Sequence, residues 1–96
     1  MKIELLDQAE TDLKVGFEFY ERQQDGLGDY FLDSLFSDVE SLHLYAGIHE
    51  QKFGYFRMLS KRFPYAIYYT FAGDLVRVYA ILDCRQSPGV PGKRLK

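Results

Sequence analysis

The chain has 96 residues, of which 47% are hydrophobic and 27% charged. This length fits one globular domain and excludes large catalytic folds such as the eight-stranded α/β barrel. The single cysteine, Cys84, excludes an intrachain disulfide framework and a multi-cysteine zinc site, and it favours a reducing compartment, most simply the cytoplasm. No apolar run reaches the roughly 20 residues of a membrane span, and the acidic start of the chain is unlike a signal peptide.

The net charge of −2 is unevenly divided along the chain. Residues 1–50 carry 3 basic and 12 acidic side chains, a balance of −9, whereas residues 51–96 carry 9 basic and 2 acidic side chains, a balance of +7. Such polarity allows a basic face to meet an anionic partner while the acidic half stays hydrated. The alternative is that the two halves neutralise one another in the folded domain.

The first part of the chain predicts a short strand followed by a helix. Residues 2–6 (KIELL) form an apolar run typical of a strand, and Asp7 with Glu10 resembles a capping box that starts a helix. An apolar stripe continues at helical spacing to a helix end near Gln23. The stripe consists of Ala9, Leu13, Phe17 and Tyr20. The glycine-containing segment 23–28 (QQDGLG) is the expected turn.

A second helix is predicted to start at Asp25 or Asp29 and to run to Tyr45 or Ala46. Because the turn before it is short, the two helices are expected to form an antiparallel hairpin. The core stripe of the second helix is Leu27, Phe31, Leu35, Val39 (or Leu42) and Ala46. A neighbouring apolar face consists of Leu32, Phe36 and Leu44. This additional face indicates either further core packing or a landing site for a partner.

After residue 47 the apolar period changes from helical to alternating, which predicts three strands. They are expected over residues 53–60, 65–71 and 75–83. Pro64 separates the first two, and the turn Ala72-Gly73-Asp74 joins the last two as an antiparallel hairpin. The proline-, glycine- and lysine-containing residues 84–96 predict a mobile basic tail.

Together these elements predict a single α+β domain over residues 1–96. Its expected order is an N-terminal strand, an antiparallel helical hairpin and three mostly antiparallel strands that form a small sheet. No catalytic or cofactor motif accompanies them, since GxGxxG, P-loop and HExxH patterns are absent from the sequence. His43 and His49 are interpreted as surface or capping residues, so no metal site and no cofactor are predicted.

Arginines and tyrosines alternate along the predicted strands. The arginines are Arg57, Arg62, Arg77 and Arg85, and the tyrosines are Tyr55, Tyr65, Tyr69 and Tyr79. This combination suits RNA, because guanidinium groups hold phosphates while rings stack on unpaired bases. Simple alternation places Arg77, Tyr79, Ile81, Asp83 and Arg85 on one side of their strand. The same pattern also occurs in sheets that bind no nucleic acid.

The second half of the chain resembles the RelE/ParE superfamily of type II toxin–antitoxin toxins, also called plasmid-stabilisation proteins. The resemblance is carried by Arg57-Met58-Leu59, by FPYAIYY at residues 63–69, by residues 76–83 and by DCRQSP at residues 83–88. The order of elements and the chain length also fit. FPYAIYY and LDCRQSP make the sequence more similar to the ParE-like branch than to the RelE-like branch.

The resemblance implies a bacterial toxin that a small cognate antitoxin, ParD-like or of another family, holds inactive in a hetero-oligomer. RelE-like members cut messenger RNA on the ribosome without a metal, whereas ParE-like members inhibit DNA gyrase. Of the RelE-like catalytic positions, Arg57 and Arg85 match, Tyr65 stands where an arginine is expected, and residues 88–93 lack the tyrosine base. A non-enzymatic gyrase inhibitor is therefore favoured.

Two alternatives remain beside the gyrase inhibitor. One is a ribosome-dependent endoribonuclease that uses Arg57, Arg85 and Tyr65, and the other is a degenerate member that only binds antitoxin. The antitoxin is expected to bind as an extended or helical acidic segment across the hairpin and the basic sheet. Its expected contacts are Leu32, Phe36, Leu44, Arg77 and Tyr79. The expected target contacts are Arg57, Arg62 and Arg85.

Overall fold

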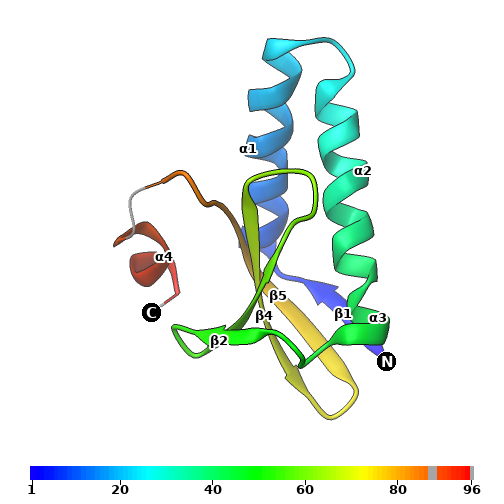
Figure 1. Cartoon of the computed structure of the whole chain (residues 1–96), viewed down its shortest axis with the longest axis vertical. Helices are drawn as coiled ribbons and strands as arrows, with labels where there is room; N and C mark the ends of the chain where they lie inside the picture. Colours follow the sequence, from blue (N-terminus) through cyan, green and yellow to red (C-terminus); the bar gives the residue numbers. More distant parts are fainter. Residues whose placement is uncertain (87–88, 96) are drawn as a thin grey trace.

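The structure, a computed structural model, describes residues 1–86 and 89–95. Its elements are β1 (Lys2–Leu5), α1 (Asp7–Gln23), α2 (Leu27–Glu40), α3 (Leu42–Tyr45), β2 (Glu50–Lys52), β3 (Tyr55–Leu59), β4 (Tyr65–Ala72), β5 (Leu75–Asp83) and α4 (Gly89–Arg94). The helices α1 and α2 stand side by side as an antiparallel hairpin, and β1, which precedes them, joins the later strands in one sheet (Figure 1). The predicted α+β class, with a strand, a helical hairpin and a mostly antiparallel sheet, is confirmed.

The sheet has five strands in the order β1-β5-β4-β3-β2. β1 pairs with β5 in parallel, and the other neighbours pair antiparallel. The sequence predicted one strand over residues 53–60, but the structure has the hairpin β2–β3, which turns at Phe53 and Gly54 with φ of 57° and 84°. β2 was missed because its three residues, Glu50–Lys52, are polar and exposed and show no apolar alternation.

The main core lies between the helical hairpin and one face of the sheet. The two helices approach closely because each places a glycine against an aromatic ring of the other. Gly16 faces the ring of Phe31, and Gly28 lies so close to Phe17 that an added methyl group would stand 2.8 Å from its carbonyl oxygen. A glycine at each position therefore permits the hairpin to close. The largest fully buried side chains include Phe31, Leu35, Leu42, Ile67 and Tyr69.

The ends of the helices differ from the sequence prediction in two respects. α1 has the predicted bounds, but its N-cap is Leu6 and no side chain caps it, so the Asp7–Glu10 capping box is not formed. Asp7 is the first helical residue rather than the residue before the helix, so its carboxylate is not placed to cap. The predicted second helix is divided at Ser41, whose hydroxyl donates to the carbonyl oxygen of Asp38 at 2.6 Å.

The C-terminal segment is a further correction, because residues 89–94 form α4 where a mobile tail was expected. α4 lies against the sheet face opposite the main core, where Leu95 is buried in a second apolar cluster. The other buried members of this cluster are Ala66, Tyr68, Ala80 and Leu82. The Arg94 guanidinium donates two hydrogen bonds of 2.9 Å to the carboxylate of Asp12 on α1. Composition gave no sign of this docking, because Asp12 is 82 positions away in sequence.

Candidate interaction surfaces

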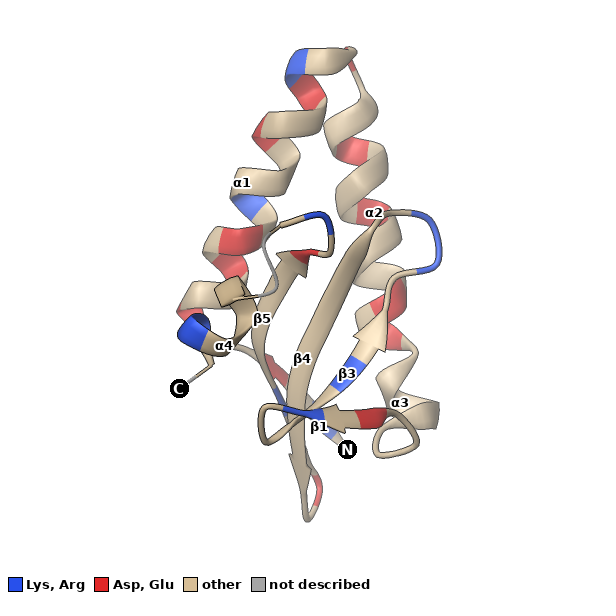
Figure 2. Ribbon diagram, turned by 60° about the vertical axis from the view of Figure 1, so that its left-hand side comes forward, with Lys and Arg blue, Asp and Glu red and all other residues tan. Residues whose placement is uncertain are grey.

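The two oppositely charged halves of the sequence remain separated in the fold. Acidic residues gather on α1 and α2, whereas basic residues lie on β2, β3, the β3–β4 loop, the segment after β5 and α4 (Figure 2). Among the described residues, two side-chain ion pairs join the halves, Arg77 with Glu4 and Arg94 with Asp12. Mutual neutralisation is therefore confined to these points, and the domain presents an acidic side and a basic side.

An apolar groove of about 720 Å³ runs along the helical hairpin. We call it the hairpin groove. Its lining is Leu5, Leu13, Phe17, Leu32 and Phe36, with Glu10, Lys14 and Glu18 beside them. Two of the three residues predicted for antitoxin binding on the second helix, Leu32 and Phe36, thus lie together in it. The third, Leu44, lies on α3, is 81% exposed and does not line the groove.

The second candidate surface is the sheet face that α4 partly covers, which we call the open face. Arg57 projects there from β3, where its Nε donates to the Tyr68 hydroxyl at 3.2 Å and its Nη2 contacts the Cys84 Sγ at 3.8 Å. These residues line a cavity of about 190 Å³ together with Lys52 and Phe53. Arg57 forms no ion pair with any carboxylate of residues 1–86 and 89–95. The cavity therefore offers a cation to an anionic group.

Arg77 and Tyr79 also belong to the open face, but the constellation expected along their strand is wrong. Tyr68 pairs with Ala80 and Tyr69 pairs with Val78, so Tyr79 is an extra residue in a β-bulge. The bulge reverses the alternation beyond it, which places Ile81 in the main core. Arg77 and Tyr79 therefore do not share a face with Ile81, Asp83 and Arg85, as simple alternation had predicted.

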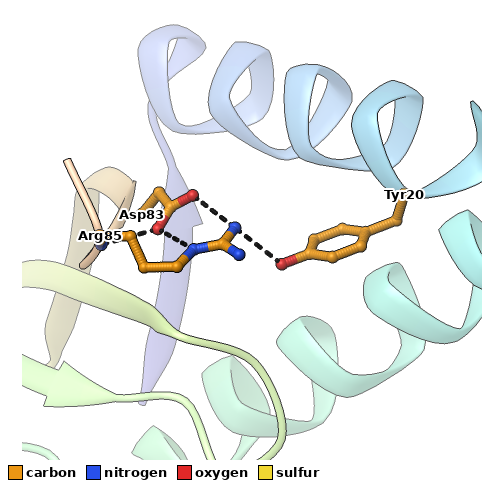
Figure 3. A network of polar contacts seen from close by, with 3 residues as sticks. All are labelled: Tyr20, Asp83 and Arg85. Atoms are coloured by element: carbon orange, nitrogen blue, oxygen red, sulfur yellow. Dashed lines mark hydrogen bonds and ion pairs between the residues drawn. The ribbon is translucent and has the colours of Figure 1, made fainter. Parts of the chain in front are cut away.

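Arg85 lies on the helix side of the sheet, where Figure 3 shows it between Asp83 and Tyr20. Its Nε and Nη2 donate to the two carboxylate oxygens of Asp83 at 3.0 and 2.7 Å, and Nη2 donates to the Tyr20 hydroxyl at 3.3 Å. These hydrogen bonds from Arg85 hold the pKa of Asp83 below its ordinary value. The Asp83 carboxylate thus balances much of the Arg85 charge. Sequence reasoning missed Tyr20, which is separated from Arg85 by 65 positions.

Tyr65 is buried in the main core and is only 7% exposed. Its ring centroid lies 5.0 Å from that of Phe31 and 6.3 Å from that of Tyr20. Burial raises the pKa of the Tyr65 hydroxyl to about 12, which keeps it protonated near neutral pH. Such a phenol is poorly placed and poorly poised to act as a base.

The structure does not bring the three residues predicted for a nuclease site together on one face. Arg57 occupies the open face, whereas Arg85 and Tyr65 lie on the helix side of the sheet. Arg62, the remaining predicted target contact, is exposed in the loop between β3 and β4. In the described part of the chain, no three His, Cys, Asp or Glu side chains are grouped to hold a metal ion. None of the helices in that part is long and apolar enough to cross a membrane.

Comparisons with known proteins show which solved structure has a similar fold. No family model and no curated protein matches the sequence. The structure is similar to a chain of the chromosomal ParDE TA system from P. aeruginosa, with a TM-score of 0.69 and 17% sequence identity. The similarity covers 84% of this chain and 92% of that chain. The fold is therefore that of a chain from a ParDE system, in agreement with the ParE-like resemblance of the sequence.

Proposed function

We propose that this chain is the toxin of a type II toxin–antitoxin pair and that a cognate, ParD-like antitoxin neutralises it in the cytoplasm. The observation that carries the proposal is the similarity of fold to a chain of the ParDE system, over 92% of that chain. The hairpin groove adds support, since it presents Leu32 and Phe36 as an apolar surface of the kind that protein partners cover. Antitoxin and toxin would form a hetero-oligomer.

In this proposal the toxin inhibits DNA gyrase by binding rather than by cleaving a substrate. The separation of Arg57 from Arg85 and the burial of Tyr65 support a binding role, because a nuclease needs its phosphate-binding and proton-transfer groups around one bond. Exposed Arg62 and the Arg57 guanidinium would contact the target. An inhibitor needs only complementary contacts there.

The second candidate function is a ribosome-dependent messenger RNA endoribonuclease. Arg57 favours it, because a partly buried guanidinium without a carboxylate partner among the described residues suits a phosphate. In that case Arg57 would act without Tyr65, which stays in the core. A degenerate member that binds antitoxin without toxicity is the third outcome.

Brief induction of the chain in growing bacteria separates these functions. We expect arrested growth with filamentous cells, broken DNA and intact messenger RNA. Codon-phased cuts in messenger RNA that disappear in Arg57→Ala, but persist in Arg77→Ala on the same face, would establish the endoribonuclease instead. Arg77 is a matched control, because it is exposed and already paired with Glu4 at 3.5 Å.

Co-purification with the small protein encoded beside the toxin tests the antitoxin part of the proposal. We expect Phe36→Asp to lose the complex, because it places a charge in the apolar groove. Val15→Asp should keep the complex, because Val15 is 61% exposed and lies outside the groove lining. Growth arrest without any complex would refute neutralisation by that protein, and a complex without growth arrest would indicate the degenerate member.

A further inference from the structure

We propose that a surface between the helical hairpin and the β3–β4 loop binds a short acidic segment of another protein, and that this segment carries an apolar or aromatic anchor. We call it the ring surface. It consists of four aromatic residues and two loop cations, Phe19, Tyr20, Tyr30, Phe63, Lys61 and Arg62. The proposal rests on the proposed function only in taking the other protein to be the target of the toxin.

The four aromatic rings form a continuous row. The Tyr20 ring centroid lies 5.0 Å from that of Phe19 and 4.9 Å from that of Phe63. The Phe63 centroid in turn lies 5.6 Å from that of Tyr30. Tyr20 is only 7% exposed, whereas Phe19 and Tyr30 at the two ends are 44% and 50% exposed. Exposed rings that rest on a packed core are typical of the side chains that a protein partner buries.

The row lies on a different side of the hairpin from the hairpin groove. Phe19 is two positions from the groove residue Phe17, and Tyr30 is two positions from the groove residue Leu32. Two positions on an α-helix correspond to a rotation of about 200°. Each outer ring therefore points to the other side of its helix, and the ring surface is a second site.

The β3–β4 loop is held in place beside the rings. The Ser60 N–H donates to the carbonyl oxygen of Tyr65 at 2.9 Å, and the Cys84 N–H donates to that of Pro64 at 2.7 Å. The Phe63 ring packs against the main core. Because the loop is already ordered, a partner that binds it loses little affinity to the ordering of this side of the interface.

The surface is positively charged at the loop. Lys61 and Arg62 are exposed and form no ion pair with any carboxylate of residues 1–86 and 89–95. At the other end of the row, the Arg85 guanidinium carbon lies 5.8 Å from the Phe19 ring centroid, but Asp83 balances much of its charge. The loop is therefore where carboxylates of a partner gain most.

The α2 side of the surface limits where those carboxylates bind. Asp33 is exposed three positions after Tyr30 and therefore lies on the same side of α2. Its carboxylate repels an acidic partner there, while Lys61 and Arg62 attract one at the loop beside α2 (Figure 2). A partner thus fits best with its apolar anchor on Tyr30 and its acidic residues over the loop.

The same arrangement argues against single-stranded nucleic acid as the occupant. Such a strand stacks its bases on open ring faces while a track of cations follows its phosphates. Here Arg85 lies over the Phe19 ring, and the Tyr30 ring rests against Phe63 at an interplanar angle of 57°. The two loop cations are neighbours in sequence and form no extended track. A short acidic segment of a protein matches both features.

Selection from a random peptide library displayed on phage tests the proposal with the purified chain. Bound peptides are sequenced, and their affinities are measured by fluorescence anisotropy at low and at high salt. We expect a class of peptides that combines aspartate or glutamate with leucine, phenylalanine or tryptophan and that binds more weakly at high salt. This class should still bind Phe36→Asp, in which the hairpin groove is altered.

Matched variants assign the class to the ring surface. We expect Tyr30→Ala to weaken binding at least about tenfold, whereas Tyr45→Ala, which removes a 51% exposed ring on α3, leaves it unchanged. Lys61→Gln should weaken binding severalfold, and Lys2→Gln, the same change of charge on β1, should not. Asp33→Asn should strengthen binding, because it removes a repelling carboxylate. Thermal melting of each variant confirms that it is folded.

Three kinds of result would overturn the proposal. The first is that no selected peptide depends on Tyr30, and the second is that the peptides which do depend on it lack acidic residues. The third is that Tyr30 is needed instead for tighter binding of a single-stranded RNA, or for self-association of the chain in analytical ultracentrifugation. Either finding would assign the ring surface to a different occupant.

The peptide experiments do not depend on the outcome of induction in bacteria. In growing cells we expect Tyr30→Ala to lose growth arrest and to keep the antitoxin complex. A chain whose growth arrest survives Tyr30→Ala keeps the proposed function and loses the ring surface as its target contact. A chain that causes no arrest, yet binds acidic peptides through Tyr30, loses the proposed function and keeps the ring surface.

Discussion

The helical hairpin and the open face of the sheet use their charged side chains in different ways. On the hairpin, acidic residues border an apolar groove, and Glu10, Asp29 and Asp33 have no ion-pair partner among the described residues. Around the open face, Arg77 and Arg94 each pair with a specific carboxylate. The hairpin is therefore held mainly by apolar packing, and three of its acidic residues are left for a partner. On the sheet side, Arg77 and Arg94 stabilise the fold itself, whereas Arg57 has no carboxylate partner among the described residues.

The largest expected effect comes from changing one of two neighbouring residues of α2 that face different sides of the helix. Leu35 is 0% exposed in the main core, and Phe36 is 44% exposed in the hairpin groove. We expect Leu35→Asp to lower the free energy of unfolding by about 4 kcal/mol or more, because it buries an unpaired charge. Phe36→Asp should cost less than about 1.5 kcal/mol, because its carboxylate stays in water. Urea unfolding followed by circular dichroism measures both.

The variants Leu35→Asp and Phe36→Asp distinguish a residue needed for folding from one needed for binding a partner. Leu35→Asp is expected to lose the fold, while Phe36→Asp is expected to remain folded and to lose the partner of the groove. Similar losses of stability in both variants would contradict the division of α2 into a core side and a partner side.

A smaller effect is expected from two arginines that each make paired hydrogen bonds to a carboxylate. Asp12 is 12% exposed and also accepts the N–H of Ile81 at 3.0 Å, so Arg94→Ala leaves a nearly buried carboxylate short of donors. We expect a loss of about 1–3 kcal/mol in the free energy of unfolding and detachment of α4. Arg85→Ala should cost less than about 1 kcal/mol, since Arg85 is 54% exposed and Asp83 can be hydrated.

Chemical denaturation measures the free energy of unfolding of Arg94→Ala and of Arg85→Ala, and so gives the difference between their costs. Amide hydrogen exchange of residues 89–95 reports whether α4 has come away from the sheet. Equal costs for Arg94→Ala and Arg85→Ala, or undiminished protection of α4 in Arg94→Ala, would show that the Asp12 contact does not hold this helix.

Local patterns in the sequence were sufficient to predict most of the elements of the fold. The bounds of α1 and β5 agree with the predicted ones, because α1 carries an apolar stripe at helical spacing and β5 is a long apolar run that begins directly after the turn at Gly73. β2 and α4 could not be predicted, since three exposed polar residues form the first and one buried leucine follows the second. Their positions are fixed by contacts with distant residues such as Asp12, which no local pattern reveals.

The candidate surfaces were only partly predictable for the same reason. Leu32 and Phe36 were found because helical spacing determines which side chains share a face, and the groove uses that face. The expected row from Arg77 to Arg85 failed because one bulge at Tyr79 reverses the alternation. Composition does not reveal a single inserted residue. Its consequence is large, because the bulge turns the end of β5 over, so that Arg85 lies on the helix side of the sheet and Arg57 on the open face.

The smallest expected effect concerns the segment that connects the two regions. The Tyr69 hydroxyl accepts the N–H of Gly47 at 3.0 Å and is hydrogen-bonded to Nδ1 of His49, which joins the chain after α3 to the centre of the sheet. Burial lowers the pKa of His49, so the folded state binds a proton less readily than the unfolded chain. Stability from this group is fully present above the unfolded pKa of about 6.5 and is lost as the pH falls through the folded pKa. We expect the free energy of unfolding to decrease as the pH falls from about 7.5 to about 5.5, and we expect His49→Gln to remove this pH dependence.

His43→Gln is the matched control, because His43 is exposed and contacts only Glu40 among the described carboxylates. Urea titrations at several pH values measure the slope, and an unchanged slope in His49→Gln would place the pH dependence elsewhere.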